Sequence, residues 1–312
     1  MWARYQPCML KIIFLGTGGS IPTPNRGMPS IMIQREGERL LFDCGEGTQR
    51  QMMKARSGFM DIGHMFLTHF HADHTLGIPG LLQTMSLQGR TEPLNIYGPD
   101  YVEEYCSLLS RLGYLSLSYQ VIPRRLSPGD VIKFKGYSVE AFRTFHSVPS
   151  LGYALKEDQK PGRFNKARAL ELGVPEGPLF SKLHRGESVV VNGRTITSEE
   201  VVGEPRRGRT IVYTGDTVAS ASFLPHLQGA DVWISESTFG DDMAGKAEET
   251  LHSTAGGVAE LAARAGVKQL VLTHVSSRYS TDTTPLLEDA RKKFDNVLVA
   301  EDFTEIELPS VE

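Results

Sequence analysis

The chain has 312 residues, of which 40% are hydrophobic and 22% are charged, and its formal net charge is −4. A chain of this length can bury a sizeable core, as one large domain or two medium ones. The small negative charge excludes a global basic field, so a polyanionic partner would have to meet a local patch. No apolar run approaches the roughly 18 residues that a membrane-spanning helix requires.

The termini and the cysteines indicate the compartment. The first residues lack the charged and apolar regions of a signal peptide, and Met9 is an alternative start. The three cysteines are scattered, so they predict neither a disulfide framework nor a paired-cysteine site. We therefore expect a cytoplasmic protein without a membrane association.

In the first half of the chain, short apolar runs alternate with segments of helical spacing. Strands are predicted at Leu10–Leu15, Ser30–Ile33, Arg39–Asp43, His64–Thr68, Leu94–Tyr97, Ser118–Ile122, Val131–Phe134 and Tyr137–Phe145. Helices are predicted at Thr48–Ala55, Leu76–Leu87 and Tyr101–Leu112, with Pro79 in the first turn of the second. The first strand ends at Gly16–Gly19, which is either a plain tight turn or a loop whose N–H groups face a phosphate.

The second half repeats this order. Strands are predicted at Thr210–Tyr213, Val232–Glu236, Gln269–Thr273, Val297–Ala300 and Phe303–Leu308, and helices at Thr254–Ala265 and Thr284–Phe294. Two halves that each contain strands and then helices favour an α/β protein with two packed sheets and helices outside, a four-layer αββα sandwich. No linker separates two units, so residues 1–312 are predicted to form a single domain.

A segment from about residue 156 to 185 departs from this pattern. It is rich in proline, glycine and charge, and it predicts one short helix at Asn165–Leu172. Its first part, Lys156–Arg168, contains five basic and two acidic residues, a local charge of +3. A long insertion without core patterning is uncommon inside a compact domain and is often functional, although a tolerated surface insertion is the simpler interpretation. We interpret it as an inserted arm.

Three of the nine histidines fall within six residues, in His69-Phe70-His71-Ala72-Asp73-His74. The cluster follows a predicted strand, on a loop that can turn several side chains toward one point. Histidine nitrogens and aspartate oxygens are the ligands that zinc prefers. A solvated polar loop is the alternative, but it gives three crowded imidazoles no purpose. The cluster therefore predicts a metal site.

Further ligands are available at the ends of other predicted strands. His146 ends the predicted strand Tyr137–Phe145. Asp216 lies in Tyr-Thr-Gly-Asp-Thr after the strand Thr210–Tyr213, and His274 follows Gln269–Thr273. A lone histidine after a strand is most often a surface residue. Three such positions together with the cluster favour ligation.

This pattern, HxHxDH after a strand with a distal histidine, Gly-Asp-Thr and a last histidine, resembles the metallo-β-lactamase superfamily. The resemblance implies that fold and two zinc ions per subunit. It assigns His69, His71 and His146 to one zinc and Asp73, His74 and His274 to the other, with Asp216 bridging them. Two such ions activate a bridging water and clamp a phosphodiester during displacement. The fold alone leaves the substrate open, because it supports many hydrolases.

Several segments resemble the ribonuclease Z family, which removes the 3′ trailer from precursor tRNA. They are FLGTGGSIPTPNR, FDCGEGTQRQM, HADHTLGIPGLL, the Leu251–Ala255 stretch LHSTA, and the Thr273–Tyr279 stretch THVSSRY. The arm contains Gly177-Pro178, similar to the glycine-proline motif of that family's tRNA-binding exosite. The resemblance implies a zinc-dependent endoribonuclease in which a metal-bound hydroxide attacks the phosphodiester and leaves a 3′-hydroxyl on the tRNA.

The resemblance also implies roles for individual residues. Asp73 is then the general base as well as a ligand. His252 lies outside the ligand set and precedes a helix, where it can donate a proton to the departing oxygen, although a surface histidine near a helix cap is the alternative. Glu236 can orient His252, or it is a solvated residue at a strand end. Arg278 can pair with phosphate or belong to a structural ion pair.

The arm would hold the tRNA body. The candidate contacts are Lys160, Arg163, Lys166, Gly177 and Pro178. A basic patch of this kind binds RNA in a salt-dependent way, whereas without the glycine-proline motif it would be interpreted as a solvated charge run. The resemblance implies a homodimer in which the arm of one subunit serves the site of the other. Two alternatives stay open: a hydrolase of the same fold acting on small phosphodiesters or related esters, and a metal-free RNA-binding module.

Overall fold

The computed structural model describes residues 10–109, 111–112 and 116–309. The alternative start at Met9 lies outside these residues, as does residue 110 of the helix predicted at Tyr101–Leu112, which the structure describes as a helix up to Leu109. Two seven-stranded sheets form the body of the protein, in the orders β16-β1-β2-β3-β4-β5-β6 and β15-β14-β13-β12-β9-β8-β7.

The first sheet and its helices come mainly from the N-terminal half. Its strands are β1 (Leu10–Gly16), β2 (Ser30–Arg35), β3 (Glu38–Phe42), β4 (Ile62–Phe66), β5 (Leu94–Gly98), β6 (Val121–Arg125) and β16 (Glu305–Leu308). Its helices are α1 (Thr48–Ala55), α2 (Ala72–Thr75), α3 (Ile78–Leu87) and α4 (Val102–Leu109).

The second sheet comes mainly from the C-terminal half. Its strands are β7 (Val131–Phe134), β8 (Tyr137–Arg143), β9 (Leu151–Glu157), β12 (Thr210–Tyr213), β13 (Val232–Glu236), β14 (Leu270–Thr273) and β15 (Val297–Val299). Its helices are α7 (Leu224–Leu227), α8 (Ala244–Thr250), α9 (Ala255–Ala265) and α10 (Thr284–Arg291), with short 3-10 turns at Ala221–Phe223, Asp241–Met243 and Ser277–Tyr279.

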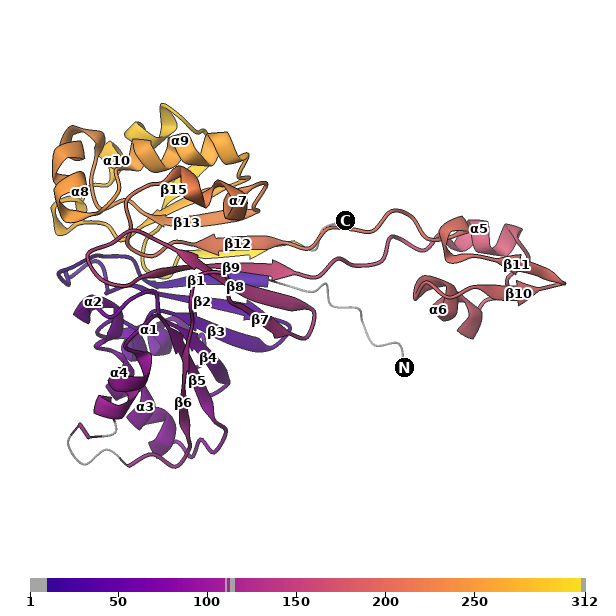
Figure 1. The fold of residues 1–312 in the computed structure, drawn as a ribbon, viewed down its shortest axis with the longest axis horizontal. Coiled ribbons are helices and arrows are strands. Elements are labelled where there is room, and N and C mark those ends of the chain that lie inside the picture. Colours follow the sequence, from indigo (N-terminus) through magenta and orange to yellow (C-terminus); the bar gives the residue numbers. More distant parts are fainter. Residues whose placement is uncertain (1–9, 110, 113–115, 310–312) are drawn as a thin grey trace.

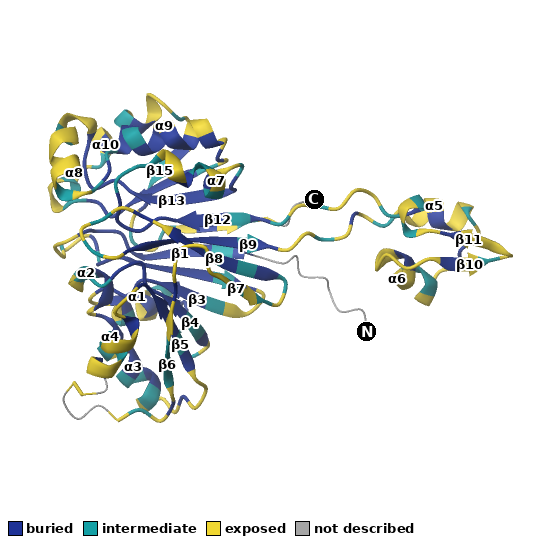
Figure 2. Ribbon diagram, in the orientation of Figure 1, coloured by how far each residue is buried: buried dark blue, intermediate teal, exposed yellow. Residues whose placement is uncertain are grey.

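The two sheets stack face to face with helices on their outer sides (Figure 1). One apolar core lies between the sheets and contains Phe14, Phe42 and Tyr153, while two others lie under the outer helices. The central strands are therefore buried on both faces (Figure 2). In β1 the side chain of Phe14 enters the core between the sheets and that of Leu15 the core under the helices, which explains its uninterrupted apolar run. The four-layer αββα prediction is confirmed.

One strand of the two large sheets was not predicted. β9 (Leu151–Glu157) pairs with β8 on one side and β12 on the other, so it is central to the second sheet. Lys156 and Glu157, expected at the start of the arm, belong to this strand, and Lys156 forms an ion pair with Glu140. The basic patch of the arm is therefore smaller than the sequence indicated.

The inserted segment leaves β9 and returns to β12 as a long protrusion (Figure 1). Its tip consists of α5 (Lys166–Glu171), α6 (Pro178–His184), β10 (Val189–Val191), β11 (Arg194–Ile196) and a 3-10 turn at Ser198–Glu200. Val189, Ile196 and Val201 share one small apolar core with Ala169 and Leu183. Because these residues pack together, the arm extends past the expected end at Arg185 and back to the start of β12.

A buried ion cluster fixes the root of this arm. The Glu157 carboxylate accepts hydrogen bonds from Arg35 at 2.9 Å and from Arg209 Nε at 2.6 Å. The side chains of Glu157 and Arg209 are each only 2% exposed. Its burial places Arg209 inside the cluster, at the point where the arm rejoins the sheet.

We expect Glu157→Gln to lower the free energy of unfolding by about 3–5 kcal/mol, because two buried guanidinium groups would lose their carboxylate. Burial alone would raise the pKa of Glu157, but the hydrogen bonds and charges of Arg209 and Arg35 hold it below its ordinary value. The stabilisation is therefore present at neutral pH and is lost as the pH falls through that lowered pKa.

Urea unfolding of the wild type and Glu157→Gln at several pH values tests this expectation. The matched control is Glu171→Gln, because Glu171 forms an exposed ion pair with Arg168, for which about 0–1 kcal/mol is expected. Equal stability of the wild type and Glu157→Gln would contradict the role given to the cluster.

Among the described residues, none of the helices is both long and apolar enough to cross a lipid bilayer.

Candidate metal centre

The predicted ligands lie together at one edge of the sandwich, where strands of both sheets end. His69, His71, Asp73 and His74 follow β4, with Asp73 and His74 in α2. His146 follows β8, Asp216 follows β12, and His274 directly follows β14. The structure thus brings together residues from distant parts of the chain, as the strand-end pattern predicted.

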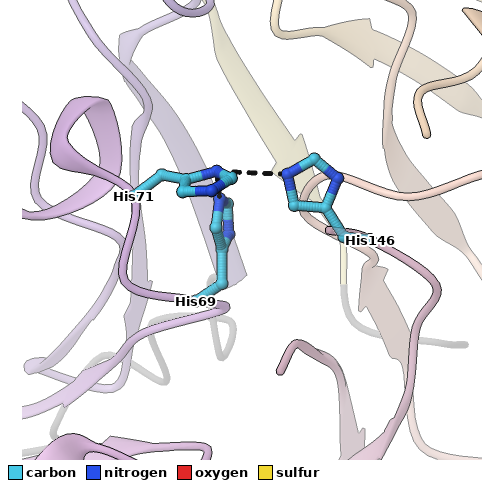
Figure 3. Close-up of side chains that lie close together, drawn as sticks. All are labelled: His69, His71 and His146. Atoms are coloured by element: carbon cyan, nitrogen blue, oxygen red, sulfur yellow. Dashed lines mark hydrogen bonds between the residues drawn. The ribbon is translucent and has the colours of Figure 1, made fainter. Parts of the chain in front are cut away.

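Three histidines form the first group, and Figure 3 shows their rings turned toward one another. His71 Nδ1 lies 3.1 Å from His69 Nε2 and 3.1 Å from His146 Nε2. Burial is the largest effect on His69, and together with the charge of His74 it holds the pKa of His69 well below its ordinary value. The ring is therefore neutral at pH 7 and keeps a lone pair for a metal ion.

Two carboxylates and two histidines form the second group. Asp216 Oδ2 lies 3.0 Å from His274 Nε2, and Asp216 Oδ1 lies 3.4 Å from His74 Nε2. Asp73 Oδ2 is 3.4 Å from His274 Nε2. Asp216 Oδ2 also lies 4.0 Å from His69 Nε2, so its carboxylate faces both groups.

The donor atoms of the second group fit a cation. His74 Nε2, His274 Nε2 and Asp216 Oδ1 are buried and make no hydrogen bond with any described residue. Such orphaned atoms are rare in folded proteins and indicate a missing ligand. Burial would lower the pKa of His274, but Asp216 raises it to about 10. The pocket therefore favours positive charge, which a divalent ion supplies when the imidazoles are neutral.

Asp43, which is not among the predicted site residues, orients the second group. Its carboxylate accepts from His74 Nδ1 at 2.8 Å, from the Tyr213 hydroxyl at 2.8 Å and from the Thr68 N–H at 2.8 Å. The hydrogen bond to Nδ1 fixes the His74 tautomer and leaves Nε2 to face the site. Asp43 lies in the FDCGEGTQRQM segment, so the only sequence signal was the family resemblance.

The loop after β1 packs against the site rather than presenting free amides. Gly19 donates its N–H to the Val275 carbonyl and Gly18 to that of Gly27, and the Ser20 N–H donates to Asp73 Oδ2 at 2.8 Å. A Cβ on Gly19 would lie 2.3 Å from the His274 ring. The glycine is therefore required by close packing on a ligand, and the phosphate-facing interpretation of this loop is not supported.

His252 and Glu236 lie beside the second group. Glu236 ends β13, and its Oε1 accepts from His252 Nδ1 at 2.8 Å. Thr238 and Ser253 donate to the other oxygen of the carboxylate, so it is fixed. Burial would lower the pKa of His252, but the Glu236 charge raises it above its ordinary value. His252 precedes the cap residue Thr254 of α9 and is therefore outside the helix. The hydrogen bond to Glu236 orients its ring.

The residues expected to contact the substrate lie outside the set of metal ligands. Arg278 is exposed and lies over the ring of Phe239, which in turn contacts the His252 ring. In the arm, Gly177 precedes α6 with φ of +139°, a conformation that only glycine adopts easily, and Pro178 begins the helix. Lys166 forms an exposed ion pair with Glu176, while Lys160 and Arg163 lie in the stalk of the arm.

This fold and this donor set define a hydrolase of the metallo-β-lactamase fold. Residues 192–275 match the family model described as "Beta-lactamase superfamily domain", and residues 10–160 match that of "Anti-Pycsar protein Apyc1". The protein YhfI from Bacillus subtilis, at 21% identity and a TM-score of 0.69 over 96% of this chain and all of its own, shares the fold.

Closer relatives identify the family. Ribonuclease Z of Methanosarcina mazei is 57% identical over 96% of this chain and 99% of its own length. That of Archaeoglobus fulgidus is 48% identical over 96% and 98%. The crystal structure of the short form of human tRNase Z superposes with a TM-score of 0.71, at 30% identity over 96% and 99% of the two chains. The chain belongs to the ribonuclease Z family.

Proposed function

We propose that this enzyme is a zinc-dependent endoribonuclease that removes the 3′ trailer from precursor tRNA. The observation that carries the proposal is the complete donor set at the sheet edge in a chain that is 57% identical to a ribonuclease Z. His69, His71 and His146 would hold one zinc, and Asp73, His74 and His274 the other, with Asp216 shared. Histidine and carboxylate donors in this number suit zinc. Bound there, the two ions supply a Lewis-acidic centre that activates water and neutralises phosphate charge.

The residues of the chain then transfer the protons and hold the reacting groups in position. Asp73 receives a proton from the attacking water, because it is the ligand carboxylate whose orientation the Ser20 N–H fixes from outside the site. Burial opposes ionisation of Asp73, but the His274 ring, whose Nε2 lies 3.4 Å from Oδ2, and the charge of His74 lower the pKa of its carboxyl, so it is ionised at neutral pH. His252 donates a proton to the departing 3′ oxygen, which leaves a 3′-hydroxyl on the tRNA. Glu236 holds the ring of His252 in position.

The arm would bind the tRNA body in a homodimer, each arm serving the partner's metal centre. Three features support this proposal. The arm starts at Glu157, at the end of β9 opposite to Leu151, so its root lies roughly 20 Å from the site. Figure 1 shows the arm extending away from the strand ends that carry the ligands, and therefore away from the metal centre of the same chain. Met53 and Leu76 are exposed beside one another around a cleft of about 320 Å³, a surface suited to a second subunit.

The decisive measurement is cleavage of a 3′-extended precursor tRNA. An arm deletion can join Gly162 to Gly203, because these two residues lie against each other in the stalk. We expect the deletion to raise KM for the precursor by about 10²-fold or more, since the RNA backbone loses its basic contacts. Hydrolysis of bis(p-nitrophenyl) phosphate, which is too small to reach the arm, should stay within about 2-fold.

A complementation experiment extends the test to the dimer. Arm-deleted subunits keep the metal centre, and Asp73→Ala subunits keep the arm. Mixed dimers should regain precursor cleavage that neither protein shows alone, because one intact arm would serve one intact site. If the arm-deleted protein cleaved the precursor as the wild type does, the proposed role of the arm would fail; a wild type that hydrolysed only the small diester would instead favour a hydrolase of small diesters.

A cytoplasmic location is also proposed. Cys44 and Cys106 are free thiols, as is usual in a reducing compartment.

A further inference from the structure

A cleft of about 700 Å³ lies beside the metal centre, on the side of His146. Its walls come from both sheets: residues after β6 of the first sheet and the β8–β9 connection of the second. Leu251, the neighbour of His252, closes it near the site. The Leu251 carbonyl accepts a hydrogen bond from His146 Nδ1 at 3.1 Å, so the cleft is continuous with a proposed ligand.

The lining of this cleft has the character of a nucleotide site. Phe145 is 39% exposed, and its backbone is fixed by hydrogen bonds with Thr217 and Val218. The Phe145 ring packs against Phe223 with ring centres 6.1 Å apart, and the Arg143 guanidinium lies over it, 5.8 Å from its centre. Among the described residues Arg143 makes no ion pair. Arg125 is paired with Asp100 at 2.6 Å, so Arg143 carries the net positive charge of the cleft. An exposed ring beside an arginine is the arrangement on which an unpaired base stacks, with its phosphate near the cation.

The position of His252 decides which nucleotide enters. Its ring centre lies 5.0 Å from that of His146, at the same end of the cleft as Leu251. The departing oxygen must lie next to the proton donor, and that oxygen belongs to the last nucleotide of the retained RNA. Resting on the proposed function, we propose that this cleft binds that nucleotide, unpaired, with its base stacked on Phe145 and its 5′ phosphate contacting Arg143.

The test uses the full-length protein and precursor tRNAs that lack a single base on one side of the cut. Removal of the base from the last retained nucleotide should lower kcat/KM of the wild type by about 10-fold. Phe145→Ala should lower kcat/KM for the intact precursor by a similar factor and then show no further loss with the abasic substrate. The loss of kcat/KM caused by removal of the first trailer base should multiply with the loss caused by Phe145→Ala, because the trailer base is expected to lie outside this cleft.

Further variants separate stacking from damage to the site. Phe145→Tyr keeps an aromatic ring and should cleave the precursor with the kcat/KM of the wild type. Arg143→Ala should raise KM for the precursor. Phe303→Ala is the matched control, since Phe303 is equally exposed, at 38%, and lies over Lys54.

Two outcomes would overturn the inference while leaving the proposed function intact. In one, the wild type cleaves the precursor and Phe145→Ala is indistinguishable from it. In the other, Phe145→Ala is non-additive with loss of the first trailer base instead, which would place the trailer in the cleft. A wild type that hydrolyses the small diester but leaves the precursor uncut would contradict the proposed function itself, and this inference with it.

Discussion

Asp73→Ala is expected to reduce precursor tRNA cleavage by at least about 10³-fold. The carboxylate is proposed both to hold a metal ion and to accept the proton of the attacking water, and loss of a positioned proton acceptor alone costs roughly 10²–10⁴-fold. Its Oδ2 lies 3.4 Å from His274 Nε2 and accepts the Ser20 N–H, so no other described carboxylate occupies the same place. The measurement is single-turnover cleavage together with the zinc content of each purified protein.

Asp282→Ala is the control for Asp73→Ala. Asp282 is an exposed aspartate outside the donor set, and its carboxylate accepts from the Thr284 N–H. Its replacement should leave both the cleavage rate and the zinc content at the wild-type level. Full cleavage by Asp73→Ala would overturn the proposed mechanism. If the variant were folded but free of zinc, its loss of cleavage would be due to the loss of metal binding.

His252→Ala is expected to slow precursor cleavage by roughly 10²–10⁴-fold and to leave hydrolysis of bis(p-nitrophenyl) phosphate within about 10-fold. The 3′ oxygen of a ribose is a poor leaving group and needs a proton, whereas p-nitrophenolate departs without one. His252 is suited to donate that proton because Glu236 Oε1 accepts from its Nδ1 at 2.8 Å. Glu236→Gln should produce a smaller loss with the same preference for RNA.

His226→Ala provides the matched histidine control. His226 forms an ion pair with Glu140 on the far side of the second sheet, so its removal should affect neither substrate. Equal losses on RNA and on bis(p-nitrophenyl) phosphate in His252→Ala would instead show that His252 supports the metal centre, and would remove its role as the proton donor.

The strands with continuous apolar runs could be predicted from the sequence because both of their faces are buried. β9 was missed since its apolar run is short and lies between a proline-containing loop and a charged segment. The extent of the arm was missed for another reason: its small core joins Ala169 to Val201 across a stretch with turn signals, and only packing shows that the two ends belong together.

The partners that orient the ligands were invisible for a third reason. Asp43 contacts His74, from which it is separated by 31 residues in the sequence. Asp302 accepts from the N–H of Thr17, 285 residues away, and so holds the loop that carries Ser20. Contacts of this separation follow from the stacking of strands and have no local periodicity. Gly19 shows the same limit, because its lack of a side chain is explained only by the His274 ring against it.

The sequence by itself determined the donor chemistry. The density of histidine and aspartate at residues 69–74, with His146, Asp216 and His274 each following a strand, specified which atoms could bind metal ions, because ligand type is a property of the side chain. The tertiary structure decided how those atoms converge and which other groups fix them. It also decided that the root of the arm lies at the opposite end of β9 from the metal centre, since the direction of a strand in a sheet is set by its neighbours and not by its own residues.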